Sequence, residues 1–177
     1  MIFDLRWACE LFHKKASQNK DPVQVSSLAN APRHYGWAEQ AISLLDPDIE
    51  SDKIPSPQLL GVLPDDHAIF YFDDVAHPKK SRKTISPTRQ QIREILQFAQ
   101  KDKNILIHCH GGLCRSPAIA IGILILKGYE PRQAVRKILN QDTNNMMEPN
   151  EVILQYIDDE LALGGELIPI LQEELRK

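Results

Sequence analysis

The segment 104–127 places a short apolar run, a glycine-containing loop and an apolar helix directly one after another. Asn104–Ile107 shows no polar alternation, which predicts a strand buried on both faces of a parallel sheet. The chain then turns at Gly111-Gly112 and enters a helix predicted over Pro117–Lys127. Because that helix is apolar nearly all round, we expect it to lie in the core. The segment therefore predicts a layered α/β domain with this strand near its centre.

Strands and helices alternate along the rest of the chain. The segments predicted as strands are short and apolar or alternating, and they cover Val23–Leu28, Ala41–Leu45 and Ala68–Phe72. The predicted helices have prolines in their first turn, helical spacing or closing glycines, and they cover Ser86–Ala99, Pro131–Leu139, Glu151–Leu163 and Pro169–Arg176. This order predicts the α/β class with a mostly parallel sheet. We expect residues 1–22 to be an N-terminal extension that can form a short helix, and residues 23–177 to be a single domain.

The composition argues against several classes of protein. A chain of 177 residues favours one compact domain, and a net charge of -3 argues against a broad nucleic-acid-binding face. The three cysteines, Cys9, Cys109 and Cys114, are an odd number, so a reducing compartment fits better than a disulfide framework. The longest apolar stretch, Ala118–Leu126, is far below the roughly 20 residues that span a bilayer. With no secretory signal recognised at the N-terminus, we expect a cytoplasmic protein without a membrane span or a nucleic-acid partner.

The loop after the central strand carries the residue types that bind and attack a phosphate. Cys109 begins the loop and Arg115 follows after five intervening residues, directly before the predicted helix. Glycines let backbone N–H groups turn inward as an anion-binding nest, and the helix N-terminus adds partial positive charge. Arg115 can hold two phosphate oxygens through its planar fork. The same positive field stabilises a cysteine thiolate, so we expect Cys109 to be a nucleophile.

Further residues of the loop have expected parts in this chemistry. Ser116 can hydrogen-bond the sulfur and help it to leave. We expect His108 to hold the loop through a side-chain hydrogen bond, because a thiolate that is already formed needs no base. The predicted phosphate- and substrate-binding residues are those of the loop itself: His110, Gly111, Gly112, Leu113, Cys114 and Arg115.

His-Cys-x5-Arg-Ser after a buried strand resembles the active-site loop of the cysteine-based protein tyrosine phosphatase superfamily, in its dual-specificity-like branch and its bacterial-type members. Val135–Ile138 followed by Glu148–Asn150 is similar to the late arginine-containing helix and the Pro-Asn turn of that branch. Asn150, after Pro149, is predicted to be the N-cap of the next helix. The resemblance covers roughly residues 23–163. It implies a three-layer fold, with a central, mostly parallel sheet of about four to five strands flanked by helices. It also implies hydrolysis of phosphate monoesters through a cysteinyl-phosphate, with no metal and no cofactor.

The resemblance also implies a general acid after the strand that ends at Phe72. A leaving alkoxide or phenoxide needs a proton donor on the side away from the thiolate, and Asp73 and Asp74 both qualify by position. The family's pattern favours Asp74 over Asp73. No Trp-Pro-Asp sequence is present, unlike in the stricter tyrosine phosphatases. The expected partners are therefore phosphorylated proteins, on phosphotyrosine or phosphoserine/threonine, or small phosphomonoesters.

Several alternatives remain open on the sequence alone. His108, Cys109, His110 and Cys114 could ligate a metal, but Cys-x4-Cys without a second ligand pair is a poor match to zinc spacing. A rhodanese-type sulfurtransferase also holds a reactive cysteine among backbone amides. A non-catalytic phosphate-binding module would keep the loop without turnover. Finally, Cys114 could resolve an oxidised Cys109 by forming a disulfide.

Overall fold

The computed structural model describes residues 21–75, 83–99 and 102–177, and within them a four-stranded sheet forms the centre of the protein. All neighbouring strands are parallel, and their order across the sheet is β1-β4-β2-β3. The strands are β1 Val23–Ser27, β2 Gln40–Leu45, β3 His67–Tyr71 and β4 Ile105–Cys109. The predicted α/β fold with a parallel sheet flanked by helices is therefore confirmed. Of the predicted N-terminal extension, residues 1–22, all but the last two lie outside the described residues, and the domain limits stay a prediction.

Strand β4 lies between β1 and β2, so the segment that follows it emerges at the middle of the sheet. Cys109 pairs in register with Ser27 of β1, and His108 pairs with both Ser26 of β1 and Ser43 of β2. Because the strands are parallel, the loops after β1, β2, β3 and β4 all leave the same edge. Ligand sites in open α/β sheets form at this carboxyl edge.

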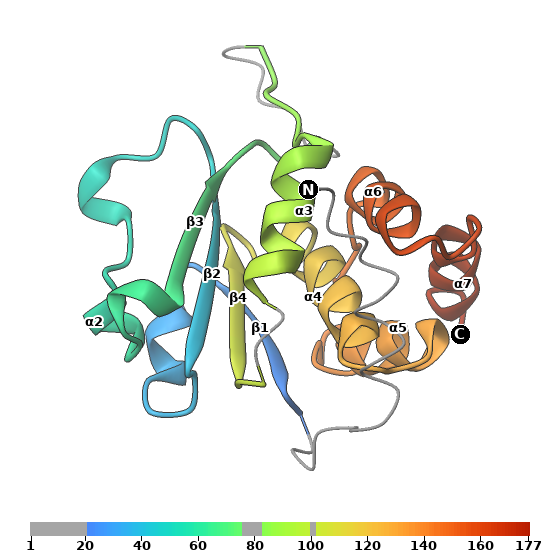
Figure 1. Ribbon diagram of the computed structural model, residues 1–177, viewed down its shortest axis with the longest axis horizontal. Coiled ribbons are helices and arrows are strands. Elements are labelled where there is room, and N and C mark those ends of the chain that lie inside the picture. The colour runs from blue at the N-terminus through green and yellow to red at the C-terminus, as the bar shows by residue number, and fades with distance from the viewer. Residues whose placement is uncertain (1–20, 76–82, 100–101) are drawn as a thin grey trace.

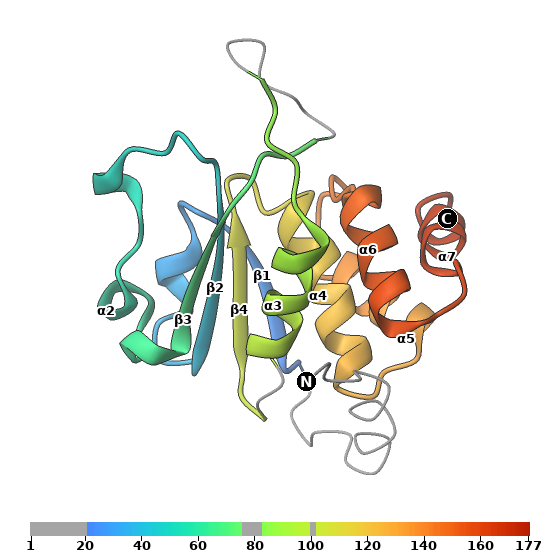
Figure 2. The ribbon, with the colours of Figure 1, turned by 45° about the horizontal axis from the view of Figure 1, so that its top comes forward.

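Successive side chains of the strands pack against different layers on the two faces of the sheet. On one face, Ile105 and Ile107 of β4 join a core with the helices α3 Arg89–Phe98, α4 Arg115–Leu126, α5 Pro131–Leu139, α6 Glu151–Leu161 and α7 Leu167–Glu174. On the other face, Leu106 of β4 packs with residues around α2 Pro57–Leu60 and the 3-10 segment Ala31–His34. Figures 1 and 2 show α2 on one side of the sheet and α3 to α7 on the other.

Helix α4 is the central helix of the larger layer, and all of its residues are buried. This confirms the expectation from its apolar sequence. A Cβ on Gly122 would lie 2.9 Å from side-chain atoms of Ile157 on α6, so the glycine permits the close approach of the two helices. The helix begins at Arg115, two residues before the predicted start at Pro117. Its positive N-terminus therefore lies inside the Cys109–Arg115 loop rather than beyond it.

Helix α3 begins later than predicted. Ser86-Pro87 was expected to open it, but Thr88 is the N-cap: its Oγ1 accepts from the backbone N of Gln91 (3.1 Å), and the Gln91 Oε1 accepts from the backbone N of Thr88 (3.0 Å). This reciprocal capping box satisfies two N–H groups that the helix start would leave unpaired.

A side chain also hydrogen-bonds the free edge of strand β1. Gln141 accepts from the Val25 N and donates to the Val23 O, both at 2.9 Å, which occupies polar groups of an exposed sheet edge.

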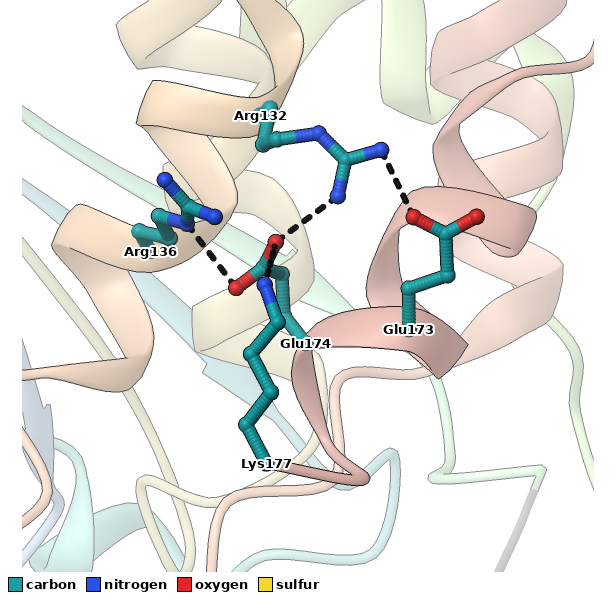
Figure 3. A network of polar contacts seen from close by, with 5 residues as sticks. All are labelled: Arg132, Arg136, Glu173, Glu174 and Lys177. Carbon is teal, nitrogen blue, oxygen red and sulfur yellow. Dashed lines mark hydrogen bonds and ion pairs between the residues drawn. The ribbon is translucent and has the colours of Figure 1, made fainter.

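Ion pairs hold the last helix, α7, against α5 (Figure 3). Arg132 donates to Glu174 (2.8 Å) and to Glu173 (2.7 Å), and Arg136 and Lys177 also donate to Glu174 (2.9 and 2.7 Å). The hydrogen bond from Arg136, followed by that from Lys177, lowers the pKa of the Glu174 carboxyl to about 2. The C-terminal helix is thus fixed by charge as well as by the buried Leu167, which packs into the main core.

Candidate active site

Cys109 is the last residue of β4, and its sulfur lies beneath the loop that leads into α4. The side chain is almost fully buried, with 2% exposed. Its Sγ accepts two hydrogen bonds at 3.2 Å, one from the backbone N of Gly112 and one from the Ser116 Oγ. The structure therefore places the predicted nucleophile and the predicted helper Ser116 in direct contact.

The two adjacent glycines of the loop have different surroundings. Gly112 has φ +74°, in the left-handed region that other L-residues avoid. A Cβ there would lie 2.7 Å from the Ser26 carbonyl carbon and from the Ser27 N, so β1 leaves no room for it. Gly111 is outside the left-handed region, and a Cβ on it would make only ordinary contacts with Leu113 at 3.8–3.9 Å. Of the two glycines, only Gly112 has positive φ, because only Gly112 turns against the end of β1.

Arg115, the first residue of α4, is anchored through one end of its guanidinium. Its Nη1 donates to the backbone O of Phe72 (2.8 Å) and to the Asp46 Oδ1 (2.7 Å), and only 4% of the side chain is exposed. Its Nε–H is buried and has no hydrogen-bond partner among the described residues. A buried donor of this kind can satisfy an oxyanion at low cost, because the anchored arginine has already lost its rotamer freedom. Asp46 was not among the residues predicted for the site.

Asp73 and Asp74 have different neighbours, which bears on the choice of general acid. The Asp73 Oδ2 accepts from the backbone N of Ile85 (2.7 Å), and only 2% of the residue is exposed. The Asp74 Oδ1 accepts from the Asn150 Nδ2 at 3.0 Å. Both residues border the cavity above Cys109. Asp73 is thus bound to the backbone of its own loop, whereas Asp74 is bound to the side chain of Asn150.

Cys114 contacts the second of these aspartates. Burial, followed by the negative charge of Asp74 and a hydrogen bond to it, raises the pKa of the Cys114 thiol to about 12. The thiol is therefore neutral at pH 7 and donates toward Asp74. Neither Cys109 nor Cys114 is in a disulfide bond with a described residue. A thiol held in its protonated form is a poor attacking group for disulfide exchange, so this environment does not favour the resolving role considered from the sequence.

The Pro-Asn turn packs directly on the loop. The backbone N of Asn150 donates to the Cys114 O, and the backbone N of Glu148 donates to the Leu113 O, both at 3.0 Å. The Asn150 Oδ1 also accepts from the Ile153 N (3.2 Å), which confirms its predicted part as the N-cap of α6. One buried asparagine thus joins the loop, Asp74 and the start of a helix. Its contact with Asp74 was not visible in the sequence.

His108 is bound to the neighbouring strand rather than to the loop. Its Nε2 lies 2.6 Å from the Ser43 Oγ, which is also 2.7 Å from the His67 Nε2, and its Nδ1 has no partner among the described residues. The expectation that His108 holds the loop is therefore wrong, because the register of β2 and β4 sets Ser43 beside it. Burial, followed by the nearby His67, lowers the pKa of His108 to about 4. The ring is neutral at pH 7.

A cavity of about 340 Å³ lies above Cys109, and it is lined by the loop after β4 and by residues that follow β2 and β3. We refer to it as the Cys109 pocket. Its volume is that of a small-ligand site. Of the predicted substrate-binding residues, all but Gly112 line it; its lining residues are Asp46, Asp73, Asp74, Cys109, His110, Gly111, Leu113, Cys114 and Arg115. The described residues contain no group of three or more potential metal ligands.

Comparison with known proteins shows what this fold resembles. No family model matches the chain, and no curated protein matches it. Among solved structures, the chain is similar to the PTP-2 phosphatase of Cydia pomonella, with 18% identity, a TM-score of 0.57, and coverage of 80% of this chain and 86% of that one. It is also similar to PTPMT1, with 15% identity, a TM-score of 0.55, and coverage of 88% and 95%.

The same PTPMT1 in complex with PI(5)P matches at 16% identity and a TM-score of 0.53, with coverage of 81% of this chain and 94% of that one. At such identities the likeness shows the fold alone. The chain therefore has the fold of the cysteine-based protein tyrosine phosphatases, as the resemblance of its loop implied. Within the described ranges, none of the helices is long and apolar enough to cross a membrane.

Proposed function

We propose that the protein hydrolyses phosphate monoesters through a cysteinyl-phosphate on Cys109. The observation that carries this proposal is the paired donation of Gly112 N–H and the Ser116 hydroxyl to the Cys109 sulfur at the N-terminus of α4. Arg115 and Asp74 border the same pocket. A nucleophile, an anion-binding group and a proton donor are thus available within one cavity.

In the first step, the Cys109 thiolate attacks phosphorus and forms an S–P bond while the P–O bond to the leaving group breaks. Arg115 balances the charge on the equatorial phosphoryl oxygens, with Asp46 fixing the end of the guanidinium that does not face phosphate. Asp74 donates a proton to the leaving oxygen, so that an alcohol or a phenol departs rather than its anion.

In the second step, water attacks phosphorus and the S–P bond breaks. Asp74, now ionised, takes the proton from water and returns to its acid form. The electron pair of the broken bond stays on Cys109, where the Ser116 hydroxyl at 3.2 Å stabilises the departing thiolate. Inorganic phosphate then leaves.

The substrates we propose are phosphotyrosine or phosphoserine/threonine in proteins, as for a dual-specificity-type, metal-independent phosphatase. The absence of a Trp-Pro-Asp sequence supports this broader selectivity over strict tyrosine specificity. The PTPMT1 structure with PI(5)P makes a phosphoinositide the competing substrate class. A thiolate nucleophile needs a reducing environment to remain active, which supports our proposal of a cytoplasmic location.

Turnover of p-nitrophenyl phosphate tests the proposal. We expect hydrolysis that vanadate inhibits, that a metal chelator leaves intact and that Cys109→Ser abolishes. Cys9→Ser, which changes the third cysteine of the chain, serves as the matched control and retains activity. Turnover of thiosulfate in place of the phosphate ester would favour the sulfurtransferase alternative. Phosphate binding without turnover of any phosphate ester would favour the non-catalytic module.

A further inference from the structure

A second cavity, of about 190 Å³, adjoins the Cys109 pocket at the carboxyl edge of the sheet, and we refer to it as the second pocket. The two cavities share Asp46 and His110 as lining residues. The other lining residues of the second pocket come from the end of β1, the end of β2 and the segment after β2. A substrate whose phosphoryl group lies above Cys109 can therefore reach into the second pocket on the far side of His110.

Three apolar side chains contribute to the lining of the second pocket. Leu45, the last residue of β2, is 1% exposed, and Leu28 follows directly after β1, where its backbone N donates to the His110 O at 3.2 Å. Ile49 lies in the segment after β2, and its backbone N donates to the Asp46 O at 3.1 Å, which closes a turn. The apolar lining thus comes from three positions, each fixed by a strand or by a backbone hydrogen bond.

The carboxylates and the lysine of the second pocket are already engaged. The Asp46 Oδ1 accepts from the Arg115 Nη1 at 2.7 Å. The Lys53 Nζ lies 2.9 Å from the Glu50 Oε2, and both of these side chains are more than half exposed, so their charges lie at the rim in contact with water. Asp48 also has an interaction partner. These carboxylates and Lys53 therefore offer no unpaired charge to a ligand.

The volume and the chemistry of the second pocket together limit what it can hold. Sites for drug-sized ligands have volumes of about 300–1,000 Å³, whereas an engineered cavity of about 150 Å³ admits benzene. A volume of about 190 Å³ therefore suits one side chain of the size of leucine or phenylalanine. Contact with Leu28, Leu45 and Ile49 removes the apolar surface of such a side chain from water, which is favourable. A charged side chain or a second phosphate group would lose hydration there without gaining a free partner.

We propose that the second pocket is a specificity subsite that takes an apolar side chain of a phosphoprotein, close in sequence to the phosphorylated residue. The inference rests on the proposed phosphatase function and adds the substrate class to it. The phosphoryl group binds on one side of Asp46 and His110, and the neighbouring apolar side chain binds on the other. The subsite also disfavours a phosphoinositide, whose polar ring substituents would contact the apolar lining.

Matched phosphopeptides test the subsite. Pairs of phosphotyrosine peptides carry leucine or asparagine at each position within two residues of the phosphotyrosine, with phosphothreonine pairs as a parallel series. Leucine and asparagine have the same branched shape, so the two members of a pair differ mainly in apolar surface. Because burial of about half of a leucine side chain corresponds to a gain of about fivefold, we expect kcat/KM to be about fivefold higher for the leucine peptide at one position or more. Peptides with lysine or glutamate at that position should react no faster than the asparagine peptide.

Ile49→Asn and Leu63→Asn provide the matched comparison. Both residues lie in the connection between β2 and β3, but Leu63 is 69% exposed and only Ile49 lines the second pocket. Each kcat/KM for a peptide is divided by that of the same variant for p-nitrophenyl phosphate, which carries no side chain to fill the subsite. We expect the leucine preference to fall to about twofold or less in Ile49→Asn and to stay at about fivefold in Leu63→Asn. Leu28→Asn, which changes a different segment of the lining, should reduce the preference in the same way as Ile49→Asn.

Equal rates for leucine and asparagine peptides at every position would overturn the proposal, as would a preference that Ile49→Asn and Leu63→Asn reduce equally. Hydrolysis of a phosphoinositide in vesicles that is faster than that of every peptide would also overturn it. In each of these cases, turnover of p-nitrophenyl phosphate by the wild type would leave the phosphatase function in place. Absence of turnover of any phosphate ester by the wild type would instead overturn the phosphatase function, and the subsite with it.

Discussion

Replacement of Gly112 by alanine tests whether the active-site loop requires a glycine where it turns against β1. At φ +74° an alanine pays the steric penalty of the left-handed region, about 1–2 kcal/mol. Its Cβ would also lie 2.7 Å from the Ser26 carbonyl carbon and the Ser27 N, and overpacking of this kind costs about 1–3 kcal/mol. The free energy of unfolding should therefore fall by about 2–5 kcal/mol, which lowers Tm by about 5–15 °C in a chain of this size.

Gly111→Ala is the matched control because the two glycines are adjacent. A Cβ on Gly111 meets only Leu113 at 3.8–3.9 Å, and the residue lies outside the left-handed region. Its free energy of unfolding should stay the same or rise by about 0.4–1 kcal/mol, because alanine restricts the unfolded chain. Urea and thermal unfolding measure both variants. If Gly112→Ala were as stable as Gly111→Ala, the described turn of the loop against β1 would be wrong.

Gly112→Ala should also impair catalysis. The Gly112 N–H is one of the two donors to the Cys109 sulfur, and a backbone shift away from β1 would move it. We expect the turnover of p-nitrophenyl phosphate to fall at a temperature where the variant is still folded. Unchanged kcat in a variant that is strongly destabilised would separate the loop geometry from catalysis and would refute this part of the reasoning.

Three further predictions follow from the site. Ser116→Ala should lower kcat about 10- to 100-fold through slow phosphoenzyme breakdown, because a hydrogen bond to a charged group contributes about 1.5–3 kcal/mol. An unchanged kcat, with no initial burst of the leaving alcohol or phenol, would contradict this role. Asp74→Ala should lower kcat for phosphotyrosine peptides about 10²- to 10⁴-fold. Asp73→Ala should mainly lower the free energy of unfolding, by about 1–3 kcal/mol, because the Ile85 N–H that it binds is left unpaired. A larger loss of kcat in Asp73→Ala than in Asp74→Ala would exchange the roles of the two residues. Because the pKa of His108 falls from 6.5 to about 4 on folding, the unfolded state binds more protons between these values. Stability should then decrease by about 3 kcal/mol as the pH falls from 6.5 to 4, and His108→Asn should show a smaller decrease in urea unfolding.

The fold class and the loop residues could be predicted because they depend on local patterns. The apolar run before Cys109 and the apolar α4 each indicate burial by themselves, and Pro131–Leu139 begins and ends where its sequence predicts. Helix starts were less certain. The predicted start of α3 at Ser86-Pro87 was wrong, because the capping box of Thr88 with Gln91 sets the boundary.

The contacts between strands could not be predicted in the same way, because they depend on the order β1-β4-β2-β3. Asp46 binds Arg115 only because β2 lies beside β4, and Ser43 reaches His108 for the same reason. Asp46 did carry a usable signal, as an acidic residue at the carboxyl end of a parallel strand. Asn150 was recognised as a helix cap, but its contact with Asp74 joins segments 76 residues apart and has no local pattern.

Trapping of the phosphorylated intermediate tests the central claim most directly. Wild-type protein mixed with a fast aryl phosphate, acid-quenched within one turnover and digested should yield one phosphorylated peptide, with the phosphoryl group on the sulfur of Cys109. The same quench of Cys109→Ser should yield no phosphorylated cysteine. A phosphoryl group on another residue, or steady release of phosphate with no covalent intermediate in Ser116→Ala, would contradict nucleophilic attack by this sulfur.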